Sequence, residues 1–206
     1  MIVLLNYGLG NLKSVKNALD RLNLKHIEVT HQDDPSLLTC EVTHFILPGV
    51  GAFDQGMSNL IDRGLDTLIH KFHQKGVKGL GICLGMQLFC SDSLEGGFLT
   101  KGLGLFNANV KYMSPYDGPI PHIGWTETIS NPNSSYEHKG DMNNPLYYVH
   151  SLHVQASEDT DVASYFTYGS NTYTSSLYKS NLLGVQFHPE KSQESGLLIL
   201  SNYLRN

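Results

Sequence analysis

Residues 77–90 read VKGLGICLGMQLFC, and this stretch decides how the chain folds. Its first half is a short, mostly apolar run that predicts a buried β-strand from Val77 to Cys83, and Leu84 to Cys90 is expected to begin a helix. A cysteine between two glycines at such a junction, Gly-x-Cys-x-Gly, is the pattern of a nucleophile elbow, in which a sharp turn lifts the side chain above a sheet. The segment therefore predicts a strand–turn–helix unit of an α/β protein.

Before this segment, short apolar runs alternate with stretches in which apolar residues recur every three or four positions. Such strand–helix alternation with short links predicts right-handed βαβ units and a mostly parallel sheet covered by helices on both faces. The expected strands span 2–5, 26–30 and 43–47, the last stopped by Pro48-Gly49, and the expected helical segments span 12–22 and 57–72, with a break near Gly64.

The pattern changes after about Glu95, because short strands follow one another without obvious helices between them. This half is expected to add antiparallel strands to the α/β core. Between residues 114 and 141 the periodicity fades and loops are expected, whereas Ser192 is expected to cap a closing helix. The expected strands are 103–112, 146–154, 163–168, 171–178 and 182–187, and the closing helix should turn Leu197, Leu200 and Leu204 inward.

Length and composition restrict the classes of protein. The 206 residues suit one domain that spans the whole chain, 1–206, and 40% hydrophobic residues are ordinary for a soluble globular protein. The formal charge of −5, with scattered basic residues, argues against nucleic acid or an anionic membrane as partner. Three cysteines form no disulfide framework, and neither a signal peptide nor a spanning apolar run is present. A cytoplasmic location is therefore expected.

A cysteine nucleophile needs a base, and the base needs an orienting group. Among the ten histidines, only His188, in Gln186-Phe187-His188-Pro189-Glu190 after an apolar strand, has a setting that supplies both. Residues two apart in an extended chain point to the same side, so Glu190 can reach one imidazole nitrogen while the other faces the thiol of Cys83. Taken alone, the cysteine motif is equally compatible with a core cysteine, and a single histidine near a strand end is more often a solvated side chain.

A third motif ends another strand in glycines at the same edge of the sheet: residues 47–53, LPGVGAF. Glycines there let backbone amides turn toward a neighbouring site, as an oxyanion hole requires, and the N–H of Leu84 at the helix start is a second donor. A simple turn is the alternative for this segment alone. Three such features at three strand ends, where open α/β sheets place their sites, favour an active site.

These motifs resemble those of the class I, triad-type glutamine amidotransferases, which carry similar Gly-Ile-Cys-Leu-Gly-Met-Gln and Gln-Phe-His-Pro-Glu segments. Further motifs narrow the resemblance to the glutaminase subunits of imidazole glycerol phosphate synthase, from histidine biosynthesis. They occur in order over essentially the whole chain. These motifs are NYGLGNL at 6–12, LPGVGAF at 47–53, EGG at 95–97, PHIGW at 121–125, VHS at 149–151 and EKS at 190–192.

The resemblance implies hydrolysis of L-glutamine to glutamate and ammonia through a catalytic triad, without a metal or other cofactor. Cys83 would attack the side-chain carbonyl, His188 would move the protons, and Glu190 would hold the imidazole. The other residues implied are Val50, Gly51 and Leu84 for the oxyanion, and Gly49, Gln87, Glu95 and Ser151 for the glutamine.

The resemblance also implies that the ammonia passes to a (β/α)8-barrel cyclase subunit in a heterodimer. Asn11 and Trp125 are the candidates for the docking face, although Trp125, the only tryptophan, is equally compatible with a core aromatic. The chain departs from the usual pattern at Asn6, where aspartate is common, at Thr126 and at Leu152. These departures keep a second interpretation open, a paralogous glutaminase that feeds a surface-sugar amidotransferase; a thiol hydrolase with the same core fold is a more distant alternative.

Overall fold

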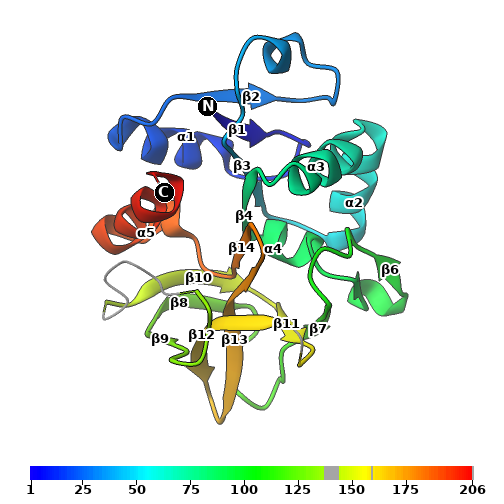
Figure 1. Ribbon diagram of the computed structural model, residues 1–206. Helices are drawn as coiled ribbons and strands as arrows, with labels where there is room; N and C mark the ends of the chain where they lie inside the picture. Colours follow the sequence, from blue (N-terminus) through cyan, green and yellow to red (C-terminus); the bar gives the residue numbers. More distant parts are fainter. Residues whose placement is uncertain (137–143, 159, 206) are drawn as a thin grey trace.

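The computed structural model describes residues 1–136, 144–158 and 160–205, and an eight-stranded sheet runs through it (Figure 1). In spatial order the strands are β2 (His26–Val29), β1 (Ile2–Leu5), β3 (His44–Gly49), β4 (Lys78–Cys83), β14 (Leu182–Val185), β13 (Asn171–Lys179), β12 (Asp161–Tyr168) and β9 (Thr128–Ser130). The first five are parallel, and the pairs from β14 to β9 are antiparallel. The predicted α/β class, with a mostly parallel sheet and added antiparallel strands, is confirmed.

Side-chain alternation along the parallel strands explains why helices cover both faces. Val3 and Leu5 of β1 belong to one hydrophobic cluster and Ile2 and Leu4 to another, because successive side chains of a strand point to opposite faces. The first cluster includes α2, α3 and α4, and the second includes α1 and α5, which lie on the other side of the sheet (Figure 1). The helices are α1 (Leu12–Arg21), α2 (Phe53–Asp62), α3 (Leu65–Gln74), α4 (Leu84–Leu88) and α5 (Gln193–Arg205).

Several predicted boundaries are confirmed in this half. The break near Gly64 separates α2 from α3, and Gly64 has a φ of 64°, which a side chain would oppose. Leu197, Leu200 and Leu204 of α5 are buried as expected. The predicted end of β3 at Pro48-Gly49 is wrong, because pairing continues there on one side only: β1 stops pairing at Ile46, whereas β4 pairs through to Gly49.

Two smaller sheets complete the chain. One pairs β10 (Leu146–His150) with β8 (His122–Thr126), and the other has the order β11-β7-β5-β6. Leu146 and Tyr148 pack in the same cluster as α5, whereas Val110 and Val154 pack in the cluster of α2 to α4. The antiparallel half therefore covers both faces of the long sheet. The remaining elements are β11 (Leu152–Ala156), β7 (Ala108–Tyr112), β5 (Asp92–Ser93), β6 (Thr100–Lys101) and the short 3-10 turns η1 (Pro35–Leu38), η2 (Glu95–Gly97) and η3 (Pro189–Lys191).

Three predictions in the antiparallel half are wrong. The strand predicted at 146–154 is two strands in different sheets, β10 and β11, which meet at Ser151. The strand predicted at 103–112 is β-structure only from Ala108 onward. The loops predicted over 114–141 include β8 and β9; β8 turns Ile123 and Trp125 outward, so no buried apolar alternation marks it. Residues 137–141 of that range lie outside the described residues.

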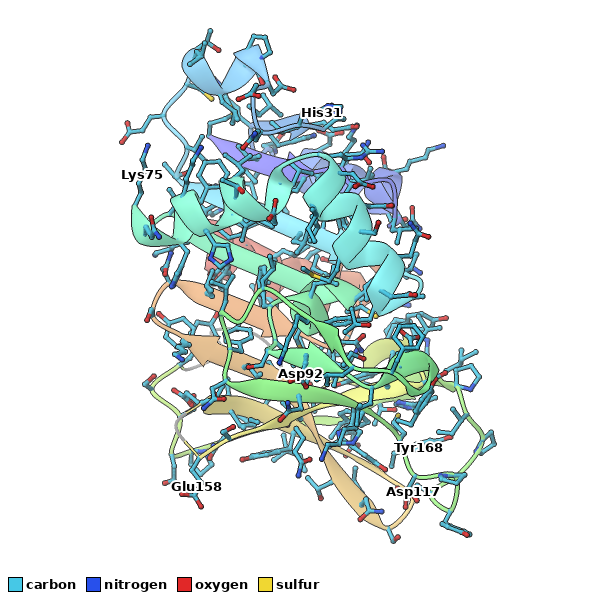
Figure 2. All side chains as sticks on the ribbon, turned by 90° about the vertical axis from the view of Figure 1, so that its right-hand side faces the viewer. His31, Lys75, Asp92, Asp117, Glu158 and Tyr168 are labelled. Atoms are coloured by element: carbon cyan, nitrogen blue, oxygen red, sulfur yellow. The ribbon has the colours of Figure 1, made fainter. Side chains whose placement is uncertain are left out.

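The part of this range before β8 is a loop, as predicted, and Asp117 organises it. Its carboxylate accepts hydrogen bonds from Asn171 (2.9 and 2.8 Å), from Ser170 and from the hydroxyl of Tyr173. Tyr168 donates to the carbonyl of Pro119 (2.7 Å). Asp117 and Tyr168 lie together at the end of the molecule opposite His31 (Figure 2).

Ser192 precedes α5 as expected, but its side chain has a different use. The hydroxyl accepts the N–H of Tyr147 (2.9 Å) and donates to the carbonyl of His188 (2.7 Å). It thereby ties β10 to the turn that carries the predicted base. Among the helices of the described residues, none has the length and apolar composition to cross a membrane.

Candidate active site

The turn at Cys83 has the backbone of a nucleophile elbow. Cys83 joins β4 to α4 with φ 54° and ψ −108°, and a positive φ is uncommon for a residue with a side chain. Close approach explains the glycine two positions on: a Cβ at Gly85 would lie 1.8 Å from the carbonyl oxygen of Leu47. Gly49 at the end of β3 is in register with Cys83. The elbow and the glycine-rich loop after β3 therefore lie side by side.

His188 and Glu190 form a buried pair just beyond β14, the neighbour of β4. The distance from Nδ1 of His188 to Oε1 of Glu190 is 2.8 Å, and each side chain is only 2% exposed. The sequence predicted this contact from an extended chain, but Pro189 instead starts the turn η3, and this turn brings Glu190 back to the ring. Within the described residues, Nε2 of His188 has no hydrogen-bond partner.

The protonation state of His188 depends on two opposing effects. Burial lowers the pKa of the ring, but the interactions with Cys83 and with the Glu190 carboxylate outweigh burial and raise the pKa to about 9. The imidazole therefore holds its proton at neutral pH, beside the sulfur and the carboxylate. Such a protonated ring favours the thiolate form of a neighbouring cysteine.

Two further groups contact the sulfur of Cys83. The carbonyl oxygen of Val149 lies 3.8 Å from Sγ, and the side-chain amide of Gln186 donates to Sγ at 3.6 Å. Gln186 is fully buried and lies two positions before His188. Its place in the same motif as His188 was the signal that could have identified it from the sequence.

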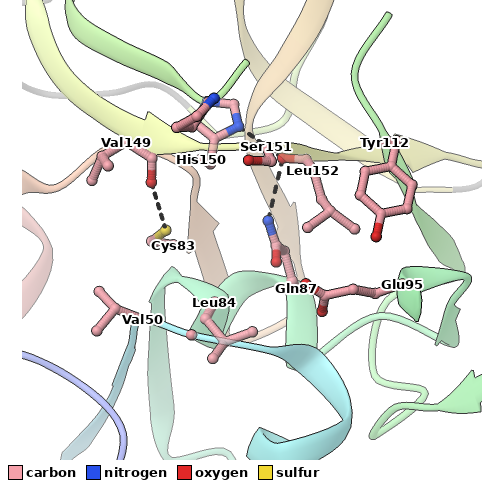
Figure 3. A pocket seen from close by; sticks show the side chains of 12 residues that line it. Val50, Cys83, Leu84, Gln87, Glu95, Tyr112, Val149, His150, Ser151 and Leu152 are labelled. Carbon is pink, nitrogen blue, oxygen red and sulfur yellow. Dashed lines mark hydrogen bonds between the residues drawn. The ribbon is translucent and has the colours of Figure 1, made fainter.

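A cavity of about 370 Å³ opens next to Cys83 (Figure 3), and this volume is within the range of small-molecule sites. We call the residues from the loop after β3, from the Cys83 turn with α4, and from η2 the floor, and those from β7, from β10 to β11 and from the segment before β8 the roof. The floor consists of Val50, Gly51, Cys83, Leu84, Gln87 and Glu95, and the roof consists of Tyr112, Pro121, Val149, His150, Ser151 and Leu152.

Most predicted site residues line this cavity. Val50, Gly51 and Leu84, predicted for the oxyanion, surround the nucleophile on the floor, and Ser151 faces them from the roof. Gly49 does not line the cavity among the described residues; it lies behind the loop, where a Cβ would come within 2.2 Å of the buried Tyr7 hydroxyl. Val149, His150, Leu152 and Tyr112 were not predicted, because only the fold brings them to this cavity.

Glu95 lies at the end of the cavity away from Cys83 (Figure 3), and it is not a free surface carboxylate. Its Oε2 accepts the N–H of Phe53 (2.6 Å), the first residue of α2, where the partial positive charge of a helix start favours an anion. Because Phe53 directly follows the loop 49–52, this contact connects the far end of the cavity to the loop beside Cys83.

Gln87 is engaged inside the protein. Its amide nitrogen lies 3.4 Å from the carbonyl oxygen of Leu152 (Figure 3) and 3.1 Å from Oε1 of Gln186. The side chain therefore connects floor and roof. What it can still offer the cavity is its carbonyl oxygen.

The roof histidine, His150, differs from His188. It is buried, and burial lowers its pKa to about 3, although its Nδ1–H donates to the carbonyl of Leu152 (2.7 Å). Its ring is consequently neutral across the working pH range. Over the described part of the chain, no group of three His, Cys, Asp or Glu side chains is placed to hold a metal ion.

The two residues predicted for the docking face are both at the surface. Trp125 is 48% exposed, so the interpretation as a core aromatic is wrong; its ring meets Tyr147 edge-on at 5.7 Å. The ammonium group of Lys191 lies 5.7 Å from the centroid of the same Tyr147 ring. Asn11 is exposed and accepts the N–H of Ser14 (3.3 Å), which caps α1.

Comparisons with known proteins show the family to which the chain belongs. The family model "Glutamine amidotransferase class-I" matches residues 3–205. The imidazole glycerol phosphate synthase subunit HisH 2 of Methanococcus maripaludis is 39% identical over 100% of this chain and 99% of its own length. The subunit HisH of Moorella thermoacetica is 42% identical over 98% of this chain and 93% of its own.

Among solved structures, one titled as a glutamine amidotransferase has a TM-score of 0.72 and 17% identity, and the match covers 98% of this chain and 97% of that one. At this identity the likeness supports the fold alone. The family model and the curated relatives go further: the chain belongs to the class-I glutamine amidotransferases and, within them, to the HisH subunits of imidazole glycerol phosphate synthase.

Proposed function

We propose that the whole chain acts as one glutaminase unit, in which Cys83, His188 and Glu190 hydrolyse L-glutamine to glutamate and ammonia for a synthase partner in histidine biosynthesis. The observation that carries this proposal is the buried His188–Glu190 pair, 2.8 Å apart, behind an elbow cysteine that faces a glutamine-sized cavity. A nucleophile, a base and its orienting group thus meet at the ends of two neighbouring parallel strands, β4 and β14.

The first half of the reaction forms a thioester. The Cys83 thiolate attacks the side-chain carbonyl carbon of glutamine, and the backbone N–H of Leu84 with those of Val50 and Gly51 stabilises the oxyanion. His188, protonated at neutral pH, then gives a proton to the departing nitrogen, so that ammonia leaves and the γ-glutamyl group remains on sulfur.

The second half regenerates the enzyme. His188, now neutral, takes a proton from water as the water oxygen attacks the thioester carbonyl. Collapse of the second tetrahedral intermediate releases glutamate and the thiolate, and His188 is again the imidazolium. Glu190 accepts the Nδ1–H throughout, so it fixes the ring orientation and stabilises its positive charge.

Recognition of glutamine is assigned to the remaining residues of the cavity. Glu95 attracts the α-ammonium group at the far end, while Ser151 and the carbonyl oxygen of Gln87 bind the polar groups of the substrate. Gly49 contributes by position, because its lack of a side chain lets the loop 49–51 pack closely over Tyr7 and Leu84.

The ammonia acceptor that we propose is a (β/α)8-barrel cyclase subunit, bound as a heterodimer partner in the cytoplasm. The docking face includes Trp125 and Asn11, with Tyr147 against the tryptophan and the Lys191 ammonium group over the Tyr147 ring. An exposed aromatic next to a cation is typical of interface anchors. Lys191 directly follows Glu190, so a partner that contacts this surface lies one residue from the triad.

The decisive test is Cys83→Ala in the complex with the partner. We expect glutamine-dependent turnover to fall by at least about 10⁴-fold, because the covalent step is lost. Synthesis supported by added ammonium salt should persist, since the acceptor site is elsewhere. Cys40→Ala, a half-exposed cysteine away from the cavity, is the matched control. Retained glutamine hydrolysis in Cys83→Ala would contradict the assignment.

The identity of the acceptor is tested by purifying the chain from native cells. Recovery of a cyclase subunit supports the histidine pathway, whereas recovery of a sugar-modifying amidotransferase subunit supports the paralogue interpretation. The isolated chain should hydrolyse glutamine slowly and the complex rapidly, because an uncoupled glutaminase wastes its substrate. Fast turnover by the isolated chain would count against coupling.

A further inference from the structure

The side chains of Gln87 and Gln186 form a buried hydrogen-bonded series that ends on the nucleophile. Both amides lie in the protein interior, 4% and 0% exposed, between the roof and Cys83. A fully buried amide needs partners for its polar atoms, so the direction in which each side chain donates is set by its neighbours.

A backbone carbonyl fixes this direction. The carbonyl oxygen of Leu152 can only accept, so the Gln87 atom that faces it, at 3.4 Å, is the amide nitrogen. The same nitrogen faces Gln186 at 3.1 Å, and the Gln186 atom there must accept and is the oxygen. The nitrogen of Gln186 consequently points the other way, to Sγ of Cys83 at 3.6 Å.

The protonation of Cys83 is therefore influenced from several sides. The carbonyl of Val149, 3.8 Å from Sγ, favours the thiol, because only the thiol can donate to it. The N–H of Gln186 favours the thiolate, because a negative sulfur is the stronger acceptor. The titratable groups that face Cys83 are His188 after β14 and the Tyr7 hydroxyl after β1, while His150 and Glu95 line the same cavity.

We propose that Gln186 is a further catalytic residue, whose N–H, aimed by Gln87, holds the Cys83 sulfur as the thiolate and turns it away from the Val149 carbonyl. This proposal rests on the proposed glutaminase function. It assigns to Gln87 a positioning role besides glutamine binding. The donor acts on the resting nucleophile, so its effect appears before any glutamine binds.

The experiment measures alkylation of Cys83 by iodoacetamide as a function of pH, read by mass spectrometry of the peptide that carries Cys83. Only the thiolate reacts, so the midpoint of the profile reports the ionisation of this thiol. Peptide resolution separates it from Cys40, which is half-exposed, and from the buried Cys90.

Three variants separate the contributions. Gln186→Met keeps the bulk and removes the donor, and we expect the midpoint to rise by about one pH unit. Gln186→Glu places a carboxylate against the sulfur and should raise it by about two units. Gln155→Glu makes the same change at an exposed position of β11 and should leave the midpoint unchanged. Unchanged midpoints in both Gln186 variants would overturn the proposal.

A second measurement uses the wild-type chain, so its outcome does not depend on whether a variant folds. The side-chain NH₂ resonance of Gln186 should shift with the same pH midpoint as the alkylation of Cys83, because the acceptor changes from thiol to thiolate. A resonance that ignores this midpoint would contradict the contact. Glutamine hydrolysis by the wild-type complex tests the glutaminase function separately, so failure of one claim is distinguishable from failure of the other.

Discussion

The floor and the roof of the cavity each hold one buried histidine, and the pKa values of the two rings shift in opposite directions. The pKa of His188, on the floor side, is raised to about 9, and the pKa of His150, in the roof, is lowered to about 3. Burial lowers the pKa of both. Glu190 and Cys83 stand beside the first ring and reverse the shift, whereas the second ring donates to the backbone carbonyl of Leu152 and meets the neighbouring ring of His122 at 3.4 Å.

The difference shows how the two halves of the molecule divide the work. The parallel half brings charged and nucleophilic groups together at strand ends, where a base can be charged and discharged. The antiparallel half adds neutral groups that close the cavity: backbone carbonyls, a neutral ring and a serine. Only the floor therefore needs the close-packed turns that hold reacting atoms in place.

The largest expected effect concerns those turns. Gly85→Ala would place a methyl group 1.8 Å from the Leu47 carbonyl oxygen, so strand β3 and helix α4 cannot keep their positions. We expect a loss of at least about 4 kcal/mol in the free energy of unfolding, or no folded protein. Gly97→Ala, at φ 83° with open space around it, should cost only about 1 kcal/mol. Chemical denaturation measures both variants, and equal losses of unfolding free energy in Gly85→Ala and Gly97→Ala would contradict this account of the turn.

The second effect is a loss of unfolding free energy at acidic pH, which we expect from His150 in the roof. Because the folded-state pKa of His150 is depressed, its contribution is present above about pH 6.5 and is lost as the pH falls toward 3, when only the unfolded chain takes up the proton. His150→Asn keeps the donor to Leu152 without the titration. Between pH 6.5 and 4, wild type should lose about 3 kcal/mol relative to this variant. If the difference in unfolding free energy between wild type and His150→Asn is the same at both pH values, the His150 ring is not held neutral by burial.

The third effect is a loss of unfolding free energy at alkaline pH, which we expect from His188 on the floor side. The folded-state pKa of His188 is raised, so its contribution is fully present below about pH 6.5 and is lost as the pH rises through 9. Compared with His188→Gln, wild type should lose about 2 kcal/mol between pH 7 and pH 9. A stability difference that does not change with pH in this range would mean that His188 is not charged by its neighbours.

The sequence predicted the floor better than the roof, for a physical reason. β1, β3 and β4 are buried on both faces, so continuous apolar runs mark them, and the glycines around Cys83 follow from contacts a few residues away. Residues 146–154 contain no glycine or proline, so nothing local indicated that the chain changes sheet at Ser151. β8 escaped prediction because Ile123 and Trp125 face outward.

The candidate site divides in the same way. Cys83, His188 and Glu190 stand in motifs whose residue types suit one chemistry, so the sequence predicts them as a candidate site without the fold. Gln186 stood in the same motif, but its contact with Cys83 depends on the direction set by Gln87 and Leu152, which lie far away in the chain. The roof residues Val149 and His150 likewise line the cavity at Cys83 only because β10 is bound beside the turn after β14, where the N–H of His188 donates to the carbonyl of Tyr147 (2.8 Å).

The smallest expected effect separates the observed contact of Glu95 with the helix start at Phe53 from its proposed contact with the substrate α-ammonium group. Glu95→Gln should lower kcat/KM for glutamine about tenfold, mainly through KM, because the charge attraction is lost. Glutaramate, which lacks the α-amino group, should be affected less than about threefold, through the weaker anchor of α2 alone. Glu158→Gln, on the exposed surface at the far end of the molecule (Figure 2), is the control.

Equal losses for the two substrates would mean that Glu95 acts only through α2 and the loop that precedes it. The floor would then hold its oxyanion loop with a charge from the cavity wall, and glutamine recognition would rest on Gln87 and Ser151.

The most direct test of the account is covalent labelling of the chain, bound to its partner, with an electrophilic diazoketone analogue of L-glutamine. If the floor is a glutaminase site, peptide mapping should find one adduct per chain, on the sulfur of Cys83, and excess L-glutamine should prevent it. The buried Cys90 and the half-exposed Cys40 should stay unlabelled. An unlabelled Cys83 in a complex that still hydrolyses glutamine would contradict the account.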